Sequence, residues 1–314
     1  MEINKIYHLD FLKNTLPDKC ANLIIADPPY FEVKGDFDFI WKSFEEYLND
    51  VEKWAKECKR ILKDSGTILW FGDAKNIAYS QIIFDKYFDL LNSIVWENTN
   101  QHKQQIRFNK GLRSFAPVTE RILMYSNETY NLTSCVYFIR EYIREEIIKS
   151  KGKINNFDIN TVLGTATNGG GVASACLSLK KAEPAMVTEE MYLKLQKWCF
   201  PFLSRQYEEL RRQYEELRRP FDNFENWGDV IRIPNFETKK FEHDTIKPEE
   251  LQRKLIRICS RENDLVVVPF SGSGTECAMA IKEKRNFIGF EIEEKHIKTA
   301  NKRIELIKRN PTLF

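Results

Sequence analysis

Near the start of the chain, four residues that could bind a planar amino group stand together as Asp27-Pro28-Pro29-Tyr30. They follow an apolar run at 22–26 that is typical of a buried strand in a parallel sheet. Because proline cannot continue a central strand, the chain leaves the sheet here, at the edge where α/β sheets bind ligands. An amino group could donate to the Asp27 carboxylate and the Pro28 carbonyl while its ring stacks on Tyr30. An ordinary Pro-Pro turn that ends the strand is the alternative.

A second candidate site lies near the other end of the chain, in Pro269-Phe270-Ser271-Gly272-Ser273-Gly274-Thr275. An apolar run at 264–268 precedes this turn, a helical pattern at 276–284 follows it, and another apolar run at 286–290 ends in Glu291. This order is typical of nucleoside-binding sites, in which glycines let the backbone approach the ligand and the acid binds ribose hydroxyls. Because the turn has no basic residue, we expect an adenosine ligand without a pyrophosphate. A purely structural glycine-rich turn is the alternative.

The segments around both motifs alternate between strand and helix patterns. Amphipathic stretches at 41–62 and 249–259 predict helices. Strands are expected at 3–10, 22–26, 67–72, 94–96, 121–125, 227–233, 264–268 and 286–290. This alternation predicts an α/β fold with a doubly wound, mostly parallel sheet.

The alternation is lost between 129 and 226, which predicts a helical insertion between two halves of one domain, 1–128 and 227–314. Helices are expected at 136–150, 157–163, 172–179 and 188–198. The short helices around a glycine turn could also form a helix-turn-helix unit with Ser174 and Ser178 facing outward. The sequence Gln-Tyr-Glu-Glu-Leu-Arg-Arg occurs twice, at 206–212 and 213–219, and predicts a helix that packs on its own domain. A homodimer contact through these heptads is the alternative.

A basic stretch at 101–115 contains no acidic residue and could contact phosphates. A solvated loop is the alternative. Its charged residues are Lys103, Arg107, Lys110 and Arg113.

The overall charge is nearly balanced, with 48 lysines and arginines against 46 aspartates and glutamates among 314 residues. The seven cysteines are scattered without a CxxC pair, and there are only four histidines, so no zinc site is expected. We expect reduced thiols in the cytoplasm. No signal-peptide pattern or 18-residue apolar run is present, so no membrane span is expected.

The two motifs, in this order, resemble those of the β-class amino-methyltransferases of DNA, which use S-adenosylmethionine. A third match is the His-x-Thr-x-Lys-Pro stretch at 243–248. The resemblance covers residues 1–128 and 227–314, and enzymes of phages and restriction systems carry insertions between such halves. One position departs from the pattern, because family members usually carry an acid that holds the cofactor's amino group where this chain has Val268.

The resemblance implies that a target base is flipped out of DNA into the pocket. Tyr30 would stack on the base, and Asp27 and the Pro28 carbonyl would accept its amino protons. Asp10 would contact the cofactor adenine and Glu291 its ribose. The other implied cofactor-binding residues are Lys247, Pro248, Phe270, Ser271, Gly272, Gly274 and Thr275.

Asp at the head of the motif resembles N6-adenine enzymes more than N4-cytosine enzymes. N4-cytosine methylation is therefore one alternative, and a catalytically silent DNA-binding or specificity subunit is another. Methylation of RNA or of a protein glutamine is a third alternative. No metal is implied.

Overall fold

The structure, a computed structural model, describes residues 1–33, 38–100, 115, 117–127, 132–167, 171–178, 186–236 and 246–309. The chain divides into two compact units. One contains residues Met1–Glu128 and Pro220–Phe314, and the other contains Thr129–Arg219. Residues 220–226, which the sequence assigned to the insertion, therefore lie in the first unit.

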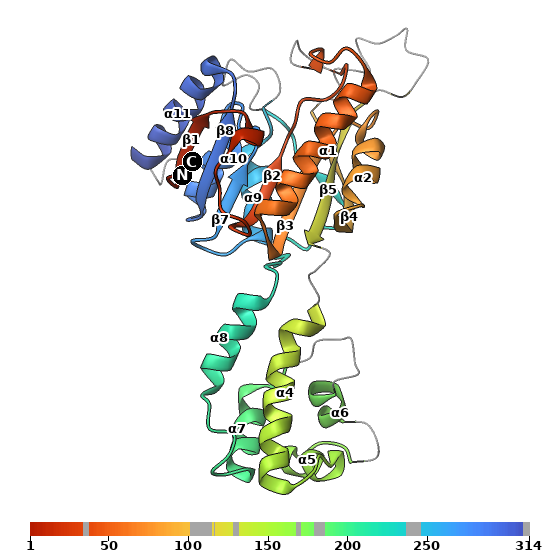
Figure 1. The fold of residues 1–314 in the computed structure, drawn as a ribbon, viewed down its shortest axis with the longest axis vertical. Coiled ribbons are helices and arrows are strands. Elements are labelled where there is room, and N and C mark those ends of the chain that lie inside the picture. The colour runs from red at the N-terminus through yellow and green to blue at the C-terminus, as the bar shows by residue number, and fades with distance from the viewer. Residues whose placement is uncertain are drawn as a thin grey trace. The chain divides into compact units, whose positions relative to one another are not determined.

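Eight strands of the described residues form one sheet in the order β1-β8-β7-β2-β3-β5-β4-β6, and all of them except β6 are labelled in Figure 1. Their bounds are β1 Lys5–His8, β2 Ala21–Ala26, β3 Leu62–Gly72, β4 Phe88–Glu97, β5 Thr119–Asn127, β6 Val230–Arg232, β7 Leu265–Val268 and β8 Asn286–Glu291. Neighbouring strands from β1 to β3 are parallel, and β5 runs antiparallel to both β3 and β4. The prediction of a mostly parallel α/β sheet is confirmed.

The central pairing of β2 with β7 brings the two sequence motifs together. Leu23 lies opposite Val266, and Ile24 lies opposite Val267. Both strands end soon after these pairs, β2 before Asp27 and β7 before Pro269. Because the strands are parallel, the two loops leave the sheet at the same edge.

Helices cover both faces of the sheet, as the doubly wound prediction requires. On one face α9 (Glu249–Cys259), α10 (Thr275–Lys282) and α11 (Glu294–Arg309) share an apolar core with the sheet. On the other face lie α1 (Phe44–Ile61), α2 (Ile77–Phe84) and the 3₁₀ helix η1 (Phe11–Lys13). Successive residues of β2 alternate between the two cores, Ile24 in one and Ile25 in the other, because side chains alternate across a strand.

The first long helix, α1, begins at Phe44, three residues after the start predicted at 41. Ser43 caps it by accepting a hydrogen bond from the Glu46 N–H, which satisfies a donor that has no partner within the helix. Val51 and Cys58, two turns apart on its apolar stripe, are fully buried. This burial fixes α1 against the sheet beside the loop that follows β2.

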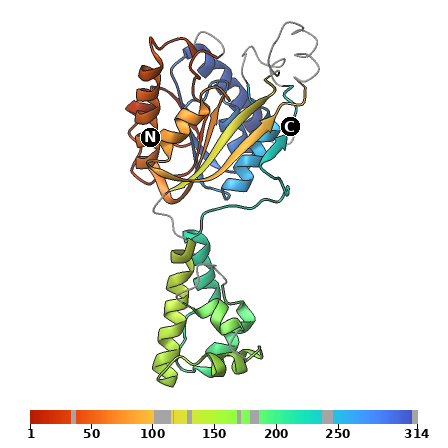
Figure 2. The same cartoon turned by 90° about the vertical axis from the view of Figure 1, so that its right-hand side faces the viewer.

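The second unit is helical, as predicted (Figure 2). It contains α4 (Leu132–Lys151), α5 (Asn156–Leu163), α6 (Val172–Leu177), α7 (Glu189–Trp198) and α8 (Tyr207–Leu217). Its own apolar core includes Ile143 of α4, Leu195 of α7 and Leu210 of α8. Among the described residues no helix is both long enough and apolar enough to cross a bilayer.

The heptad helix α8 packs on its own unit. Tyr207, Leu210 and Tyr214 are buried in the core of the second unit, which confirms that prediction. The fourth heptad position differs, because Leu217 is 49% exposed. Leu217 is the last residue of α8, where the chain is about to turn at Pro220, so it no longer faces the core.

The short helix α6 is held by two arginines of α4. Arg140 donates to the Ser178 and Ala175 carbonyls, and Arg144 donates to the Leu177 carbonyl. Ser178 is half-buried, as is Ser174, so neither is fully outward-facing. The helix-turn-helix hypothesis stays a prediction.

Candidate active site

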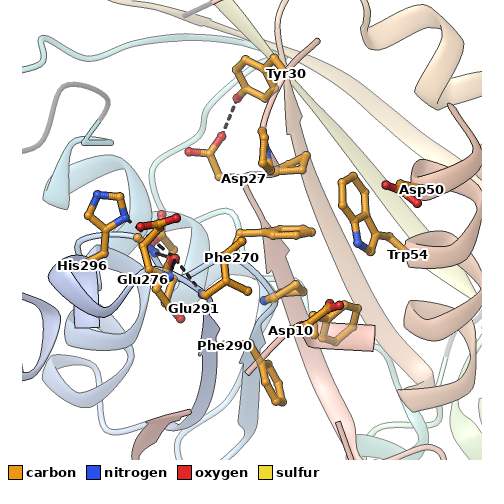
Figure 3. Close-up of a pocket in the computed structure, with 18 of the residues that line it drawn as sticks. Asp10, Asp27, Tyr30, Asp50, Trp54, Phe270, Glu276, Phe290, Glu291 and His296 are labelled. Carbon is orange, nitrogen blue, oxygen red and sulfur yellow. Dashed lines mark hydrogen bonds and ion pairs between the residues drawn. The ribbon is translucent and has the colours of Figure 1, made fainter. Parts of the chain in front are cut away.

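A cavity of about 480 Å³ lies at the carboxyl edge of the sheet (Figure 3). The loops after β1, β2, β7 and β8 supply most of its wall. Lining residues include Asp10, the whole Asp27-Pro28-Pro29-Tyr30 motif, Phe270 and Glu291. The two motifs predicted from sequence therefore share one cavity.

The Asp27 carboxylate has two close partners. Lys247 Nζ lies 2.5 Å from Oδ2, and the Tyr30 hydroxyl donates to Oδ1 at 2.5 Å. Lys247 also lies 3.2 Å from Glu120 Oε2, and its side chain is 5% exposed. The sequence assigned Lys247 to the cofactor pocket; the structure places its ammonium on the predicted catalytic acid as well.

The pKa values of both Lys247 and Tyr30 are raised in the folded protein. Burial alone would lower the pKa of Lys247, but the carboxylates of Asp27 and Glu120 outweigh burial and raise it. Burial, reinforced by the Asp27 charge, raises the pKa of Tyr30 well above its usual value. Lys247 is therefore a cation and Tyr30 a hydrogen-bond donor at neutral pH.

Residues outside the Asp27-Pro28-Pro29-Tyr30 motif hold its loop in place. Its prolines have no N–H to donate, and the Tyr30 N–H donates to the buried Asp38 carboxylate at 2.6 Å. The Phe31 carbonyl accepts a hydrogen bond from Asn76 Nδ2 at 2.7 Å. Asp38 and Glu120 were not predicted from the sequence, because neither lies in a motif. Asp38 accepts from Tyr30 within the same loop, whereas Glu120 reaches Lys247 only through the fold.

Glu291 organises the glycine-rich turn. Its Oε2 accepts from the Gly272 N–H at 2.7 Å, and its Oε1 accepts from the N–H groups of Ile292 and Glu293. Burial raises the pKa of Glu291, but hydrogen bonds from His296 and the backbone outweigh it, so the net pKa is lowered. Glu291 is therefore charged at the cavity wall, where it can still accept a ligand hydroxyl on Oε2.

The wall near Asp10 and Glu291 is largely aromatic. The ring centroids of Phe270 and Trp54 are 4.9 Å apart, and Phe11 packs against Phe270 at 6.4 Å. Asp10 accepts from the Leu12 N–H and lines the cavity. An apolar slot for a purine with carboxylates for polar groups fits an adenosine moiety, as the sequence predicted.

Two of the predicted cofactor-binding residues do not line the cavity in the described part of the chain. Pro248 is the N-cap of α9. Gly274 has a φ of +76°, and a Cβ added there would lie 2.7 Å from the Ala300 Cβ of α11. Glycine is thus needed at 274 for backbone conformation and for packing against α11.

Two further predicted residues, Ser271 and Thr275, line the cavity, but their hydroxyls also form hydrogen bonds within the protein. Ser271 lines the cavity, but its hydroxyl donates to the Val268 carbonyl at 3.4 Å. Thr275 lines the cavity, and its hydroxyl accepts from Arg303 Nη1 at 2.8 Å. Val268 itself is 1% exposed and belongs to the core rather than to the described cavity wall. The predicted DNA-binding residues Lys103, Arg107, Lys110 and Arg113 lie outside the described residues.

An acid that sequence analysis did not single out, Glu276, also lines the cavity. It lies in the first turn of α10 and is 5% exposed. Burial, and then the charge of Asp27, raise the pKa of Glu276 to about 7. Acidic residues are common in the first turn of a helix, so the sequence alone did not indicate that Glu276 lies at the site.

A doubly wound sheet whose carboxyl edge joins an adenosine-sized slot to an Asp-Pro-Pro-Tyr loop defines an α/β methyltransferase. Comparison with known families agrees: residues 21–302 match the family model described as DNA methylase. The chain belongs to the DNA methylase family.

Known relatives align along nearly the whole chain. The Type II methyltransferase M.HinfI of Haemophilus influenzae is 29% identical over 313 residues, covering 95% of this chain and 66% of the relative. The DNA adenine methyltransferase YhdJ of Escherichia coli K12 is 25% identical over 309 residues, covering 97% and 84%. The chain thus spans just under two thirds of M.HinfI and most of YhdJ.

A solved structure has the same fold. The complex of M1.HpyAVI with S-adenosylmethionine superposes with a TM-score of 0.51 at 20% identity, covering 96% of this chain and 98% of the other.

Proposed function

We propose that this chain transfers a methyl group from S-adenosylmethionine to the exocyclic N6 of adenine in DNA. The observation that carries the proposal is that Asp27 and Tyr30 share one cavity with Glu291 and the Gly272 turn. An amino-group acceptor and a nucleoside-binding loop are therefore within reach of each other. Membership of the DNA methylase family, and the adenine activity named for YhdJ, support this choice.

The residues present fit the cofactor, which when bound supplies an activated methyl group on a sulfonium. Phe270 and Trp54 would pack on the adenine, and Glu291 would accept from the ribose. At the other side of the cavity, Asp27 would accept from the target amino group and orient the nitrogen lone pair toward the methyl. Orientation and fixed charges do most of the catalysis, because the methyl donor is already activated.

Lys247 must yield its place for the amino group to reach Asp27. Its ammonium now donates to Asp27 and lies 5.7 Å from the Tyr30 ring centroid. Glu120, at 3.2 Å, is a second carboxylate that can keep the ammonium paired. We therefore propose that Lys247 shifts from Asp27 toward Glu120 when a base enters, so that neither charge is left buried alone.

DNA contacts are assigned to two other segments. We propose that the basic stretch with Lys103, Arg107, Lys110 and Arg113 binds phosphates, and that the second unit, Thr129–Arg219, chooses the target sequence. A homodimer contact through the heptads would rely on Leu217 alone, because the other three heptad positions are buried in the chain's own core.

Sequencing of DNA from cells that express the protein, with a readout of modified bases, tests the proposal. The expected result is N6-methyladenine at one sequence context, absent in cells that express Asp27→Asn. N4-methylcytosine would instead establish the cytosine alternative. DNA binding without any modified base would identify a silent specificity subunit.

A further inference from the structure

Glu276 is a buried acid of the cavity wall that the mechanism above does not use. It is the second residue of α10, is 5% exposed, and is labelled in Figure 3 among the lining residues. Among the described residues it forms no ion pair. The hydrogen bond that lowers its pKa comes from its own backbone N–H. Its carboxylate therefore has no cationic partner of its own in the described part of the chain.

Among the described residues, the charged groups with the largest effect on the pKa of Glu276 are Asp27, Lys247 and Arg303. The two cations lie close enough to lower its pKa, but both are bound elsewhere. Lys247 is paired with Asp27, and Arg303 contacts the Thr275 hydroxyl and the Glu249 carboxylate. Burial and the Asp27 charge raise the pKa of Glu276 more than these cations lower it, so ionising the carboxyl is costly. A cation brought by a ligand would remove that cost.

The position of Glu276 indicates which cation this is. The sulfur of S-adenosylmethionine carries three groups: the methyl, the ribose, and a chain that ends in an α-ammonium and a carboxylate. With the ribose at Glu291 and the methyl directed at Asp27, the amino-acid chain must leave the sulfur in a third direction. Glu276 lines the same cavity as Asp27 and Glu291, and it follows directly on the turn that Glu291 holds.

We propose that Glu276 binds the α-ammonium group of the cofactor, in an ion pair that forms only when the cofactor is bound. This inference rests on the proposed function, because it concerns the same cavity. It assigns to α10 the amino-group contact that the resemblance led us to expect at position 268, where Val268 lies in the core.

Calorimetry with two probes tests the proposal: S-adenosylhomocysteine, which has the α-ammonium, and 5′-methylthioadenosine, which lacks the whole amino-acid chain. The full-length wild type, Glu276→Gln and Glu294→Gln are compared at pH 8. Glu294 is a matched control, since its side chain is 66% exposed and pairs with Lys298. Thermal unfolding of each variant confirms that it is folded.

We expect Glu276→Gln to weaken S-adenosylhomocysteine binding at least tenfold while changing methylthioadenosine binding less than twofold. Glu294→Gln should bind both probes like the wild type. Equal losses for both probes would overturn the proposal, because Glu276 would then only maintain the cavity. Unchanged binding of both probes would also overturn it, with the proposed function intact. If the wild type binds neither probe, the proposed function fails and the inference fails with it.

Discussion

Replacing Glu276 by glutamine should change how the stability of the protein depends on pH. The carboxyl has an ordinary pKa of 4.5, and in the folded protein its pKa is raised to about 7, mainly by burial. The folded state therefore binds this proton more tightly than the unfolded state. The resulting stabilisation is fully present below pH 4.5 and is lost as the pH rises to about 7.

The magnitude follows from the difference between the two pKa values. At 1.36 kcal/mol per pKa unit, a change from 4.5 to about 7 corresponds to about 3 kcal/mol. Between pH 5.5 and 8 about 2 kcal/mol of this loss should occur in the wild type. Glutamine has a similar shape and does not titrate. The stability of Glu276→Gln relative to the wild type should therefore rise by about 2 kcal/mol over this range.

Urea unfolding followed by tryptophan fluorescence is a suitable assay. Five of the six tryptophans lie in the unit that contains the sheet, so the signal reports mainly on that unit. They are Trp41, Trp54, Trp70, Trp96 and Trp227. The exposed control Glu294→Gln should show a constant difference from the wild type over this range. A constant difference for Glu276→Gln as well would refute the argument that Glu276 is buried without a cation.

Three other substitutions test separate parts of the structure. Lys247→Met should destabilise the protein by about 3 kcal/mol or more in urea unfolding, because it removes one partner of a buried ion pair. Adding Asp27→Asn should recover much of this loss. A Lys247→Met variant as stable as the wild type would contradict the pairing. Gly274→Ala should lower stability by at least about 1 kcal/mol, since its φ is +76° and its Cβ would meet Ala300; an unchanged unfolding midpoint would contradict this packing. Phe270→Ala should weaken methylthioadenosine and S-adenosylhomocysteine binding by the same factor in calorimetry. Weaker binding of S-adenosylhomocysteine alone would show that Phe270 does not contact the adenine.

Local patterns were enough to predict the sheet and the two loops. The apolar runs that became β2 and β7 are short and end at proline, so their type and their carboxyl ends follow from propensity and sterics. The heptad helix α8 was also predictable from its local sequence. The exception is Leu217, which is exposed because it lies at the end of the helix. These features depend on neighbours in the sequence.

The side-chain partners in the cavity could not be predicted in this way. Lys247 is 220 residues from Asp27 in the sequence, and only the fold brings its ammonium to the carboxylate. Gly274 was assigned to ligand approach, whereas the close neighbour of its missing Cβ is Ala300, on a helix that follows later. Glu276 looks like a common helix-start acid until burial makes its charge costly. Each of these properties arises from long-range packing.

The role of Asp27 is the central claim, and single-turnover methyl transfer to DNA by Asp27→Asn tests it most directly. Asparagine keeps the size of the side chain and an acceptor for the Tyr30 hydroxyl, but it loses the charge that orients the amino group. With saturating S-adenosylmethionine, we expect the rate to fall a few hundredfold, or about 3–4 kcal/mol, while S-adenosylhomocysteine affinity changes less than about threefold. A rate within a few fold of the wild type would contradict the assignment of Asp27 as the residue that binds the target amino group.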